Sequence, residues 1–447
     1  MTCFGITLGT FTPMSLSPTS PPSPTETLFP VTTNTAVIAT PTVASTVEEP
    51  FSGQVNVIEI NGFKDETDHW YFYGLVRNDT NRPIYDLQIE VKLIDSAGIE
   101  VYTYTINTLL NYLTPGETSP FSDFTADPFP DGQTMQATVV SFSHSISIKH
   151  ANLEFRGITL WVDEYNDLYL AGEVFNGSAD PVEINAIAGS LSDETNTFVT
   201  ASSAYPFLGY LEPNGSGPFV MMFDAPIGEA DSLTNYTLYS DALVTNPTSI
   251  VDISLSDKQN DYQDTIGNFH LAGSVTNNSA KPINIHLVAG AYDANGNCLD
   301  ANSVYLPLPV NSGETLPYDF TIWGALDFVQ AAYDAAIHYK IYIDWLSTYE
   351  VSSQAYSLPT IEDTNSINQG VAVYTGTVIN NSGQDLYTTI VIVAIYDKLS
   401  GELIATNYAF VPEFLPNNGT GFYELSLFPP IDIDPQNIDI IITALGQ

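Results

Sequence analysis

Apolar residues alternate with polar ones over many short stretches of this chain, and turn residues separate the stretches. A spacing of two places alternate side chains on one face of a strand, so this pattern predicts half-buried β-strands. The segment that most favours a short helix is 327–336. The pattern of hydrophobic and polar positions therefore predicts an all-β fold.

Four of these strands share a motif in which a glycine is followed by a valine and an asparagine at every second position. The glycines and asparagines are Gly74 and Asn78, Gly172 and Asn176, Gly273 and Asn277, and Gly376 and Asn380. Successive glycines lie 98, 101 and 103 residues apart. This period matches one small β domain and exceeds that of a solenoid repeat, so it predicts one module copied four times.

A second shared position is the aspartate that ends the next alternating strand of each copy, followed by turn residues. The four aspartates are Asp95, Asp193, Asp293 and Asp397. Aspartate accepts local backbone hydrogen bonds and glycine supplies positive φ, so these segments predict hairpin turns. The second copy, Asp193–Asn196, lacks the glycine. Further on, each copy has a proline- or glycine-containing turn and then a strand that holds Phe124, Phe223, Phe320 or Leu427.

The motif residues have structural interpretations. A glycine in the middle of a strand indicates a bulge or the close approach of a neighbouring aromatic ring. The asparagine is expected to end its strand in a local side-chain turn. We therefore interpret all twelve glycines, asparagines and aspartates as structural residues and not as site residues.

Each copy offers six or seven short strands, which is typical of a β-sandwich. The predicted organisation is a disordered Ser/Thr/Pro-rich stalk at 1–52, followed by four tandem immunoglobulin-like sandwiches at 53–148, 149–247, 248–347 and 348–447. The junctions are short, so we expect a semi-rigid array to which each sandwich adds the length of its strands and loops, ~40 Å.

The glycine–valine–asparagine strand, the strand that ends in Tyr292-Asp293 or Tyr396-Asp397, the proline/glycine turn and the phenylalanine strand together resemble the FxLYD domain. Copies one and two have Ile94 and Ser192 at the tyrosine position. The resemblance covers nearly all of residues 54–447. It implies an immunoglobulin-type sandwich found on bacterial envelope and secreted proteins, and it implies no catalytic residues.

The amino-terminal segment differs in composition from the rest of the chain. Residues 12–50 are rich in proline, serine and threonine, which predicts an extended stalk without packed structure. Cys3 precedes this stalk, and the layout resembles that of a mature bacterial lipoprotein, which implies a lipid anchor on Cys3. Only two residues precede Cys3, so an upstream start, a missing leader and an ordinary thiol stay open. No run of eighteen apolar residues predicts a transmembrane segment. Cys298 is expected to be a buried or half-buried free thiol.

The formal net charge is −42, from 52 acidic and 10 basic residues. Charged residues make up 14% of the chain, against roughly 25% in a typical domain, so the imbalance comes from missing cations. Nucleic-acid binding needs clustered lysine and arginine, and an anionic membrane surface would repel this chain. The composition excludes these partners and remains compatible with a cationic or divalent one.

Candidate chemistry is sparse. The six histidines do not recur at matching positions, and no phosphate loop, nucleophile elbow or paired-cysteine zinc motif is present, so we expect no catalytic residues and no cofactor. Calcium is a weak alternative at 293–297 with Asp300, where a hairpin turn explains the same residues, or at the junction carboxylates 163–164 and 362–363. A sugar-stacking tryptophan is a second alternative, among Trp70, Trp161, Trp323 and Trp345.

The sequence thus predicts a non-enzymatic, acidic, extracellular or envelope protein of a bacterium that serves surface display, adhesion or envelope structure. Its partner would be a protein or glycan at the cell surface. Two alternatives stay open: a carbohydrate- or peptide-binding module, and a self-associating subunit of an extracellular filament or surface layer whose strand edges pair.

Overall fold

The computed structural model of the chain describes residues 50–447, except for 66–67, 126–133, 145–148, 164–166, 205–206, 227, 247–250, 266, 323–329, 337, 369–370, 413, 431–432 and 435. The following description concerns residues 51–447, which form one compact unit. Cys3 and the predicted stalk, up to residue 49, lie outside the described residues. The boundaries between the four predicted copies stay predictions, and we call these copies repeat 1 to repeat 4.

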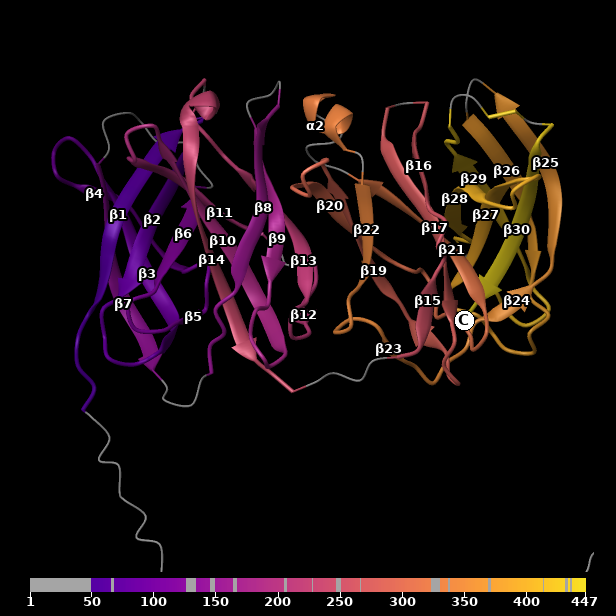
Figure 1. The fold of residues 1–447 in the computed structure, drawn as a ribbon, viewed down its shortest axis with the longest axis horizontal. Coiled ribbons are helices and arrows are strands. Elements are labelled where there is room, and N and C mark those ends of the chain that lie inside the picture. The colour runs from indigo at the N-terminus through magenta and orange to yellow at the C-terminus, as the bar shows by residue number, and fades with distance from the viewer. Residues whose placement is uncertain are drawn as a thin grey trace, which may run out of the picture. The chain divides into compact units, whose positions relative to one another are not determined.

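The predicted all-β fold is confirmed, because antiparallel strands make up nearly all of the regular structure (Figure 1). Within the described part of the chain, the helical elements are the short helix α2 (Gln330–Ala335) and the 3-10 turn η1 (Ala230–Ser232). Helix α2 lies inside the segment that the sequence favoured for a helix.

Repeats 1 and 2 each contain seven strands that form two sheets. The strands of repeat 1 are β1 (Val55–Lys64), β2 (Trp70–Asn78), β3 (Ile84–Ile94), β4 (Glu100–Asn107), β5 (Tyr112–Leu113), β6 (Thr118–Phe124) and β7 (Thr134–His144). The strands of repeat 2 are β8 (Glu154–Val162), β9 (Leu168–Phe175), β10 (Val182–Asp193), β11 (Phe198–Ala204), β12 (Tyr210–Leu211), β13 (Ser216–Phe223) and β14 (Leu233–Val244).

Repeats 3 and 4 follow the same plan, with a split first strand in repeat 3. The strands of repeat 3 are β15 (Ile253–Leu255), β16 (Asn260–Gln263), β17 (Phe269–Asn277), β18 (Ile283–Asn284), β19 (His286–Tyr292), β20 (Cys298–Tyr305), β21 (Thr315–Ile322) and β22 (His338–Ile343). Strand β23 (Tyr349–Glu350) lies just past the predicted boundary of repeat 3 and pairs with β18 in a two-stranded sheet. The strands of repeat 4 are β24 (Tyr356–Leu358), β25 (Thr360–Asn368), β26 (Val371–Ile379), β27 (Thr389–Asp397), β28 (Leu403–Phe410), β29 (Thr420–Leu427) and β30 (Ile438–Gly446).

In each repeat one sheet contains the glycine strand and the other contains the strand that leads to the motif aspartate. The first sheet, which we call the glycine sheet, is β1-β2-β6, β8-β9-β13, β15/β16-β17-β21 and β25-β26-β29 in the four repeats. The second, the aspartate sheet, is built on β3, β10, β19 and β27. Apolar side chains of both sheets fill the space between them and form one main core for each repeat.

The motif glycine makes room for an aromatic ring inside the sandwich. Gly273 pairs with Tyr318 across β17 and β21, and a Cβ atom at Gly273 would lie 2.5 Å from Tyr318 Cζ. Gly376 and Tyr423 repeat this arrangement at 2.7 Å. Since real Cβ atoms do not approach carbon this closely, the ring occupies the place of the missing side chain. Phe121 and Phe219 stand opposite the other two glycines.

The motif asparagine connects the two sheets of its repeat. Asn277 is fully buried, and its Nδ2 lies 2.8 Å from both the Lys281 and the Val310 carbonyl oxygens, while its Oδ1 accepts the Ser279 N–H. Asn78, Asn176 and Asn380 make the equivalent bonds in the other repeats. One side chain therefore bonds three backbone groups, and Val310 O accepts the Ile283 N–H as well.

The motif aspartate organises the following hairpin turn. Asp95 Oδ1 accepts backbone N–H groups from Ala97 and Ile99, at 2.9 and 2.8 Å. Asp193, Asp293 and Asp397 accept equivalent bonds. The turn needs one left-handed residue, which is Gly98 at φ 82° in repeat 1. In repeat 2, which lacks the glycine, Asn196 takes this conformation at φ 63°, because asparagine tolerates it better than most residues do.

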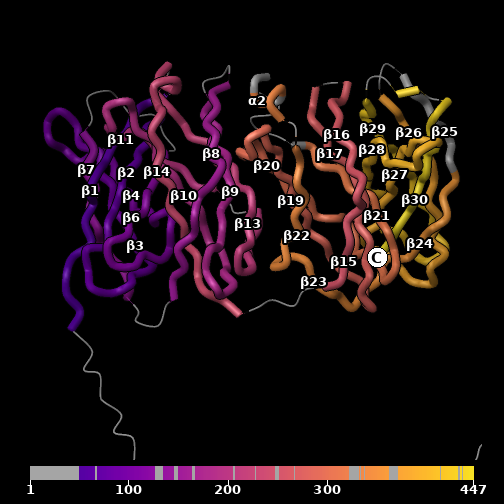
Figure 2. The backbone as a smooth tube through the Cα atoms, viewed as in Figure 1, coloured from indigo at the N-terminus to yellow at the C-terminus, as the bar shows by residue number. Residues whose placement is uncertain are grey.

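The repeats stack on one another through sheet faces. We call the strand after each aspartate turn the outer strand, which is β4, β11, β20 or β28. The outer strands β11, β20 and β28 lie across the glycine sheets of repeats 1, 2 and 3, respectively. Figures 1 and 2 accordingly show β10 and β11 on the side toward repeat 1 and β9 and β13 on the side toward repeat 3.

This stacking changes two expectations from the sequence. The glycine strand of repeat 1 is buried at every position from Phe72 to Val76, so it is covered on both faces and is not half-buried. In addition, the expectation that each sandwich extends the array by the length of its strands is wrong, because neighbouring repeats contact through sheet faces and not end to end.

We predict that Asn277→Ala lowers the free energy of unfolding by about 1–3 kcal/mol, because it removes the hydrogen bonds that a fully buried side chain makes to three backbone groups. The measurement is denaturant unfolding of the full chain. Asn278→Ala is the matched control, since Asn278 is exposed and adjacent. Equal effects of the two substitutions would contradict the proposed connection between the sheets.

Candidate functional site

Polar and titratable side chains gather at the junctions between stacked repeats. Each junction consists of the outer face of one glycine sheet and the outer strand of the next repeat. These surfaces are buried by stacking, so any polar group in them needs a partner. We therefore treat the three junctions as the candidate functional site.

One hydrogen bond recurs in all three junctions. Its donor is the residue that pairs with the position just before the motif glycine, and its acceptor is a backbone carbonyl near the start of the next outer strand. The three bonds are Asn61 Nδ2 to Val199 O at 3.0 Å, Thr159 Oγ1 to Cys298 O at 2.5 Å, and Asn260 Nδ2 to Ile404 O at 2.7 Å. Equivalent donors thus bond the first or second residue of the next outer strand, and the junctions follow one stacking rule.

A buried carboxylate characterises the junction of repeats 2 and 3. Glu173 Oε1 on β9 accepts hydrogen bonds from the hydroxyls of Tyr292 and Tyr342 at 2.8 and 2.7 Å, and it pairs with Lys340 Nζ at 3.1 Å. Burial raises the pKa of Glu173, but the bonds from Tyr342, Tyr292 and Lys340 outweigh it and hold the pKa below its ordinary value. The carboxylate therefore stays charged and connects the two repeats.

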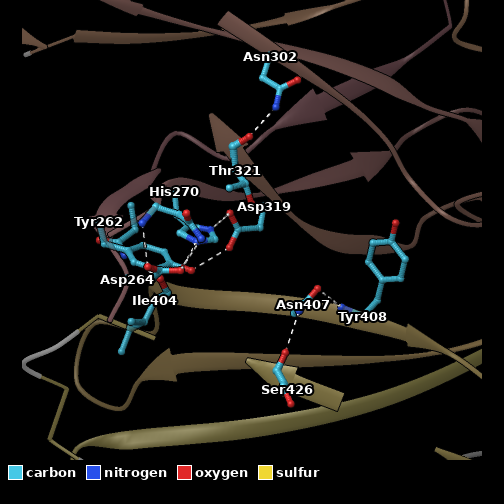
Figure 3. A network of polar contacts seen from close by, with 12 residues as sticks. Tyr262, Asp264, His270, Asn302, Asp319, Thr321, Ile404, Asn407, Tyr408 and Ser426 are labelled. Atoms are coloured by element: carbon cyan, nitrogen blue, oxygen red, sulfur yellow. Dashed lines mark hydrogen bonds and ion pairs between the residues drawn. The ribbon is translucent and has the colours of Figure 1, made fainter. Parts of the chain in front are cut away.

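A histidine between two aspartates characterises repeat 3 where it meets repeat 4 (Figure 3). His270 on β17 places Nδ1 3.0 Å from Asp319 Oδ1 and Nε2 3.2 Å from Asp264 Oδ2. Tyr262 stacks on the imidazole with ring centroids 4.7 Å apart, and its hydroxyl donates to Asp319 Oδ2 at 2.9 Å. The backbone of Asp264 forms a β-bridge with Pro430, so this cluster borders repeat 4.

The environment of the cluster fixes its protonation. Burial alone would lower the pKa of His270, but hydrogen bonds to Asp319 and Asp264 and the charges of these residues raise it above its ordinary value. Burial and the adjacent Asp319 raise the pKa of the Tyr262 hydroxyl far above its usual range. Tyr262 therefore remains a protonated donor and is a poor nucleophile. The cluster resembles a proton relay in composition, but each member has a structural partner.

Figure 3 also shows how the outer strands are held to their own repeats. Asn302 on β20 donates through Nδ2 to Thr321 O at 2.5 Å, and Asn407 on β28 donates to Ser426 O at 2.9 Å. These bonds connect the outer strand with the glycine sheet of the same sandwich. The outer strand is thus positioned from both sides, by its own repeat and by the preceding one.

The motif residues predicted to be structural lie within the sandwiches, and none of them belongs to the polar groups of the junctions. The possible calcium loop at 293–297 is the hairpin turn described above, and the buried Asp300 accepts the Ala301 N–H at 2.8 Å. Across the described residues, no three histidine, cysteine, aspartate or glutamate side chains are grouped so that they could hold a metal ion. Of the predicted junction carboxylates, residue 164 and the side chains of 362–363 lie outside the described part.

Among the described residues, no tryptophan is fully exposed as a surface on which a sugar could stack. Trp70, Trp161 and Trp345 are partly buried, and Trp323 lies outside the described residues. The expectation for Cys298 is confirmed, since it is a buried free thiol at the junction of repeats 2 and 3. Burial raises the pKa of this thiol, which disfavours the reactive thiolate.

The junction donors were not predicted, although their signal is present in the sequence. Asn61, Thr159 and Asn260 are all small polar residues on the strand that pairs with the glycine strand. A comparison of outward-facing positions among the four copies would have found them. The aromatic residues opposite the motif glycines were also missed. The sequence pointed to Phe124 and Phe320, whereas the rings beside the glycines belong to Phe121 and Tyr318 on the same strands.

The described residues include no helix that is long and apolar enough to cross a membrane.

No family model matches the sequence, and a search of curated proteins finds no match. Structural similarities include red sea bream transglutaminase, with 12% identity over 44% of this chain and 31% of that chain at a TM-score of 0.16. Native Escherichia coli alpha-2-macroglobulin shows 8% identity over 87% and 26% of the two chains at a TM-score of 0.13. The elastase-activated form of the same protein shows 10% identity over 88% and 43% at 0.14. The chain spans less than half the length of these proteins, and such low scores support no inference about function.

We predict a pH dependence at the junction of repeats 3 and 4. The pKa of His270 in the folded chain lies above the ordinary value of 6.5, so its pairing stabilises the fold fully below pH 6.5 and loses this effect as the pH rises through the folded-state pKa. His270→Gln should therefore lower the free energy of unfolding most in mildly acidic buffer, and the difference from the wild type should shrink as the pH rises.

Denaturant unfolding over a series of pH values measures this difference. His338→Gln is the control, because His338 is an exposed histidine of the same repeat and should leave the pH profile unchanged. A difference between His270→Gln and the wild type that grows with rising pH would show that the sign of the proposed linkage is wrong.

For the junction of repeats 2 and 3, we predict that Glu173→Ala lowers the free energy of unfolding by about 1–3 kcal/mol, since the Tyr292 and Tyr342 hydroxyls lose their shared acceptor and keep only the bond to each other. Exposed Glu194→Ala removes the same charge without a buried partner and serves as the control. Thermal and denaturant unfolding of both variants test the prediction, which fails if the two variants are equally stable.

Proposed function

We propose that this chain is a non-enzymatic bacterial cell-surface protein in which four FxLYD-like sandwiches form a semi-rigid array for surface display, adhesion or envelope structure. The observation that supports this proposal most directly is the recurring junction. Three successive pairs of repeats use the same outer strand, the same glycine-sheet face and the same donor position. A chain whose repeats share one stacking rule is suited to holding a fixed spacing.

The junctions also support the proposed stiffness. Domains within one chain move relative to one another by default unless their interface is large and apolar. Here Tyr73, Ala171 and Ala272 are buried on the outer faces of their glycine sheets, where they contact the next repeat. Each junction adds a directional side-chain bond to this apolar contact. Bending at a junction would therefore expose apolar surface and break a hydrogen bond.

The chemistry of the described residues supports a structural role over a catalytic one. Tyr262, His270 and Glu173, three groups with shifted pKa values, are engaged in contacts that hold strands in place. The strongly negative charge of the chain disfavours nucleic acid and anionic membrane surfaces as partners. A surface protein that projects away from an anionic envelope fits this composition.

We further propose that the proline-rich segment acts as the stalk and that a lipid on Cys3 acts as the anchor. The support is the order of a cysteine, a Ser/Thr/Pro-rich segment and folded repeats along the sequence. Acyl chains attach a protein to a membrane without a spanning helix.

We predict that Ala171→Arg uncouples repeats 2 and 3 without harming either core. Ala171 is fully buried at the junction, whereas Thr375, at the same position of repeat 4, is only partly exposed to solvent and lies outside any junction between repeats. Scanning calorimetry should show one coupled transition for residues 51–447 in the wild type and in Thr375→Arg, and separate transitions in Ala171→Arg. A wild type that already unfolds in independent steps would contradict a semi-rigid array.

For the anchor, we predict that Cys3→Ala moves the protein from the membrane fraction to the medium when the full gene is expressed in its host. Metabolic labelling with an alkyne fatty acid should mark the wild type and not the variant. An unlabelled wild type that remains in the cytosolic fraction would contradict both the anchor and the surface location.

A further inference from the structure

The outer face of the aspartate sheet has a distinct composition in repeats 2, 3 and 4, where it contacts the preceding repeat. Three positions define this face: five and three residues before the motif aspartate, and the first residue of the outer strand. They hold Ala188, Ser190 and Phe198 in repeat 2, Val288, Gly290 and Cys298 in repeat 3, and Ile392, Ala394 and Leu403 in repeat 4. All nine residues are buried, and nearly all of them are small or apolar.

The same three positions of repeat 1 hold a charged cluster. They are Glu90, Lys92 and Glu100. Lys92 Nζ lies 3.3 Å from Glu90 Oε1 and 2.9 Å from Glu100 Oε2, and the Glu100 side chain is 48% exposed. Thr103 on the outer strand and Gln136 on β7 flank Lys92 with further polar groups. Repeat 1 therefore carries charges where the other repeats carry packing residues.

The other end of the stack differs. The glycine sheet of repeat 4 belongs to the same series of faces as the three that receive an outer strand. On β26, Val373, Thr375 and Thr377 are only partly buried, and the neighbouring Ile361 and Phe422 are each 54% exposed. This face presents apolar and hydroxyl groups, together with the exposed carboxylate of Glu424 opposite Thr375, in the register that repeats 1 to 3 use for stacking.

These two faces would meet if one copy of the chain stacked on another. Such a contact would be head to tail and would not close on itself, so it would add copies without limit. It would also bury Glu90, Lys92 and Glu100 under Phe422 and its neighbours. Taking these charges out of water costs several kcal/mol for each ion, and the exposed carboxylate of Glu424 on the repeat 4 face would repel Glu90 and Glu100.

We propose that the charged face of repeat 1 is a cap that stops a second copy of this chain from stacking its repeat 4 glycine sheet there. Repeat proteins use a polar outer face on terminal repeats to remain soluble. The contact that this cap prevents would be a fourth junction, formed between the repeat 4 glycine sheet of one copy and repeat 1 of the next. Glu90, Lys92 and Glu100 prevent it from forming. The chain accordingly does not polymerise through its junction surface.

The test exchanges the cap for the junction residues of repeat 2 in the full chain, as Glu90→Ala, Lys92→Ser and Glu100→Phe together. Light scattering after size exclusion should give the monomer mass of 48.6 kDa for the wild type and multiples of this mass for the triple variant. Adding Thr375→Arg, which places a charge on the repeat 4 face, should return the triple variant to a monomer. Circular dichroism confirms that each variant is folded.

The matched control is Lys281→Ser with Glu350→Phe, which removes an exposed ion pair and adds one phenylalanine on β23, away from both faces. This control should stay monomeric. A folded triple variant that stays monomeric overturns the proposal. A wild type that forms head-to-tail oligomers broken by Thr375→Arg overturns it as well. Oligomers of the triple variant that persist with Thr375→Arg would show that another face is responsible, which also contradicts the proposal.

Discussion

The structure of residues 51–447 depends on one contact, the packing of each outer strand across the glycine sheet of the preceding repeat. This contact covers the second face of the glycine strand, which its own sandwich leaves open. It is mainly apolar and gains direction from the recurring bond to the outer-strand carbonyl. The buried carboxylate of Glu173 and the paired His270 are local elaborations of this contact, and they explain why titratable groups gather at the junctions.

The stacking in turn requires well-defined sandwiches, and the motif residues supply them. The glycine admits an aromatic ring into the core, so its strand lies close to the ring-bearing strand. The buried asparagine at the end of the glycine strand bonds the backbone of the two connecting segments beside it and holds them together. The aspartate sets the hairpin that delivers the outer strand to the junction. Because the same motif residues recur inside every sandwich, the two outer sheet faces lie at matching positions in every repeat.

Much of this fold follows from local patterns in the sequence. Alternating apolar positions, the hundred-residue period, and the turns after Asp95 and Asp397 predict the sheets and the hairpins, because each depends on neighbouring residues. The junctions were not predicted, since alternation alone assigns one face of a strand to solvent. Distinguishing a covered outer face from an exposed one requires comparing copies position by position, as the contrast between Lys92 and Gly290 shows. The His270 cluster occurs in one repeat only, so no periodic signal marks it.

The most direct test of face-to-face stacking is a cross-link between repeats. Ala171 and Cys298 belong to one buried cluster at the junction of repeats 2 and 3, so Ala171→Cys in a chain without Cys3 places two thiols together. Mild oxidation should yield an intramolecular disulfide between residues 171 and 298, and a short bifunctional thiol reagent should cross-link the same two residues. Thr375→Cys should yield neither product. Links that form only between molecules, or equally with Thr375→Cys, would contradict the account.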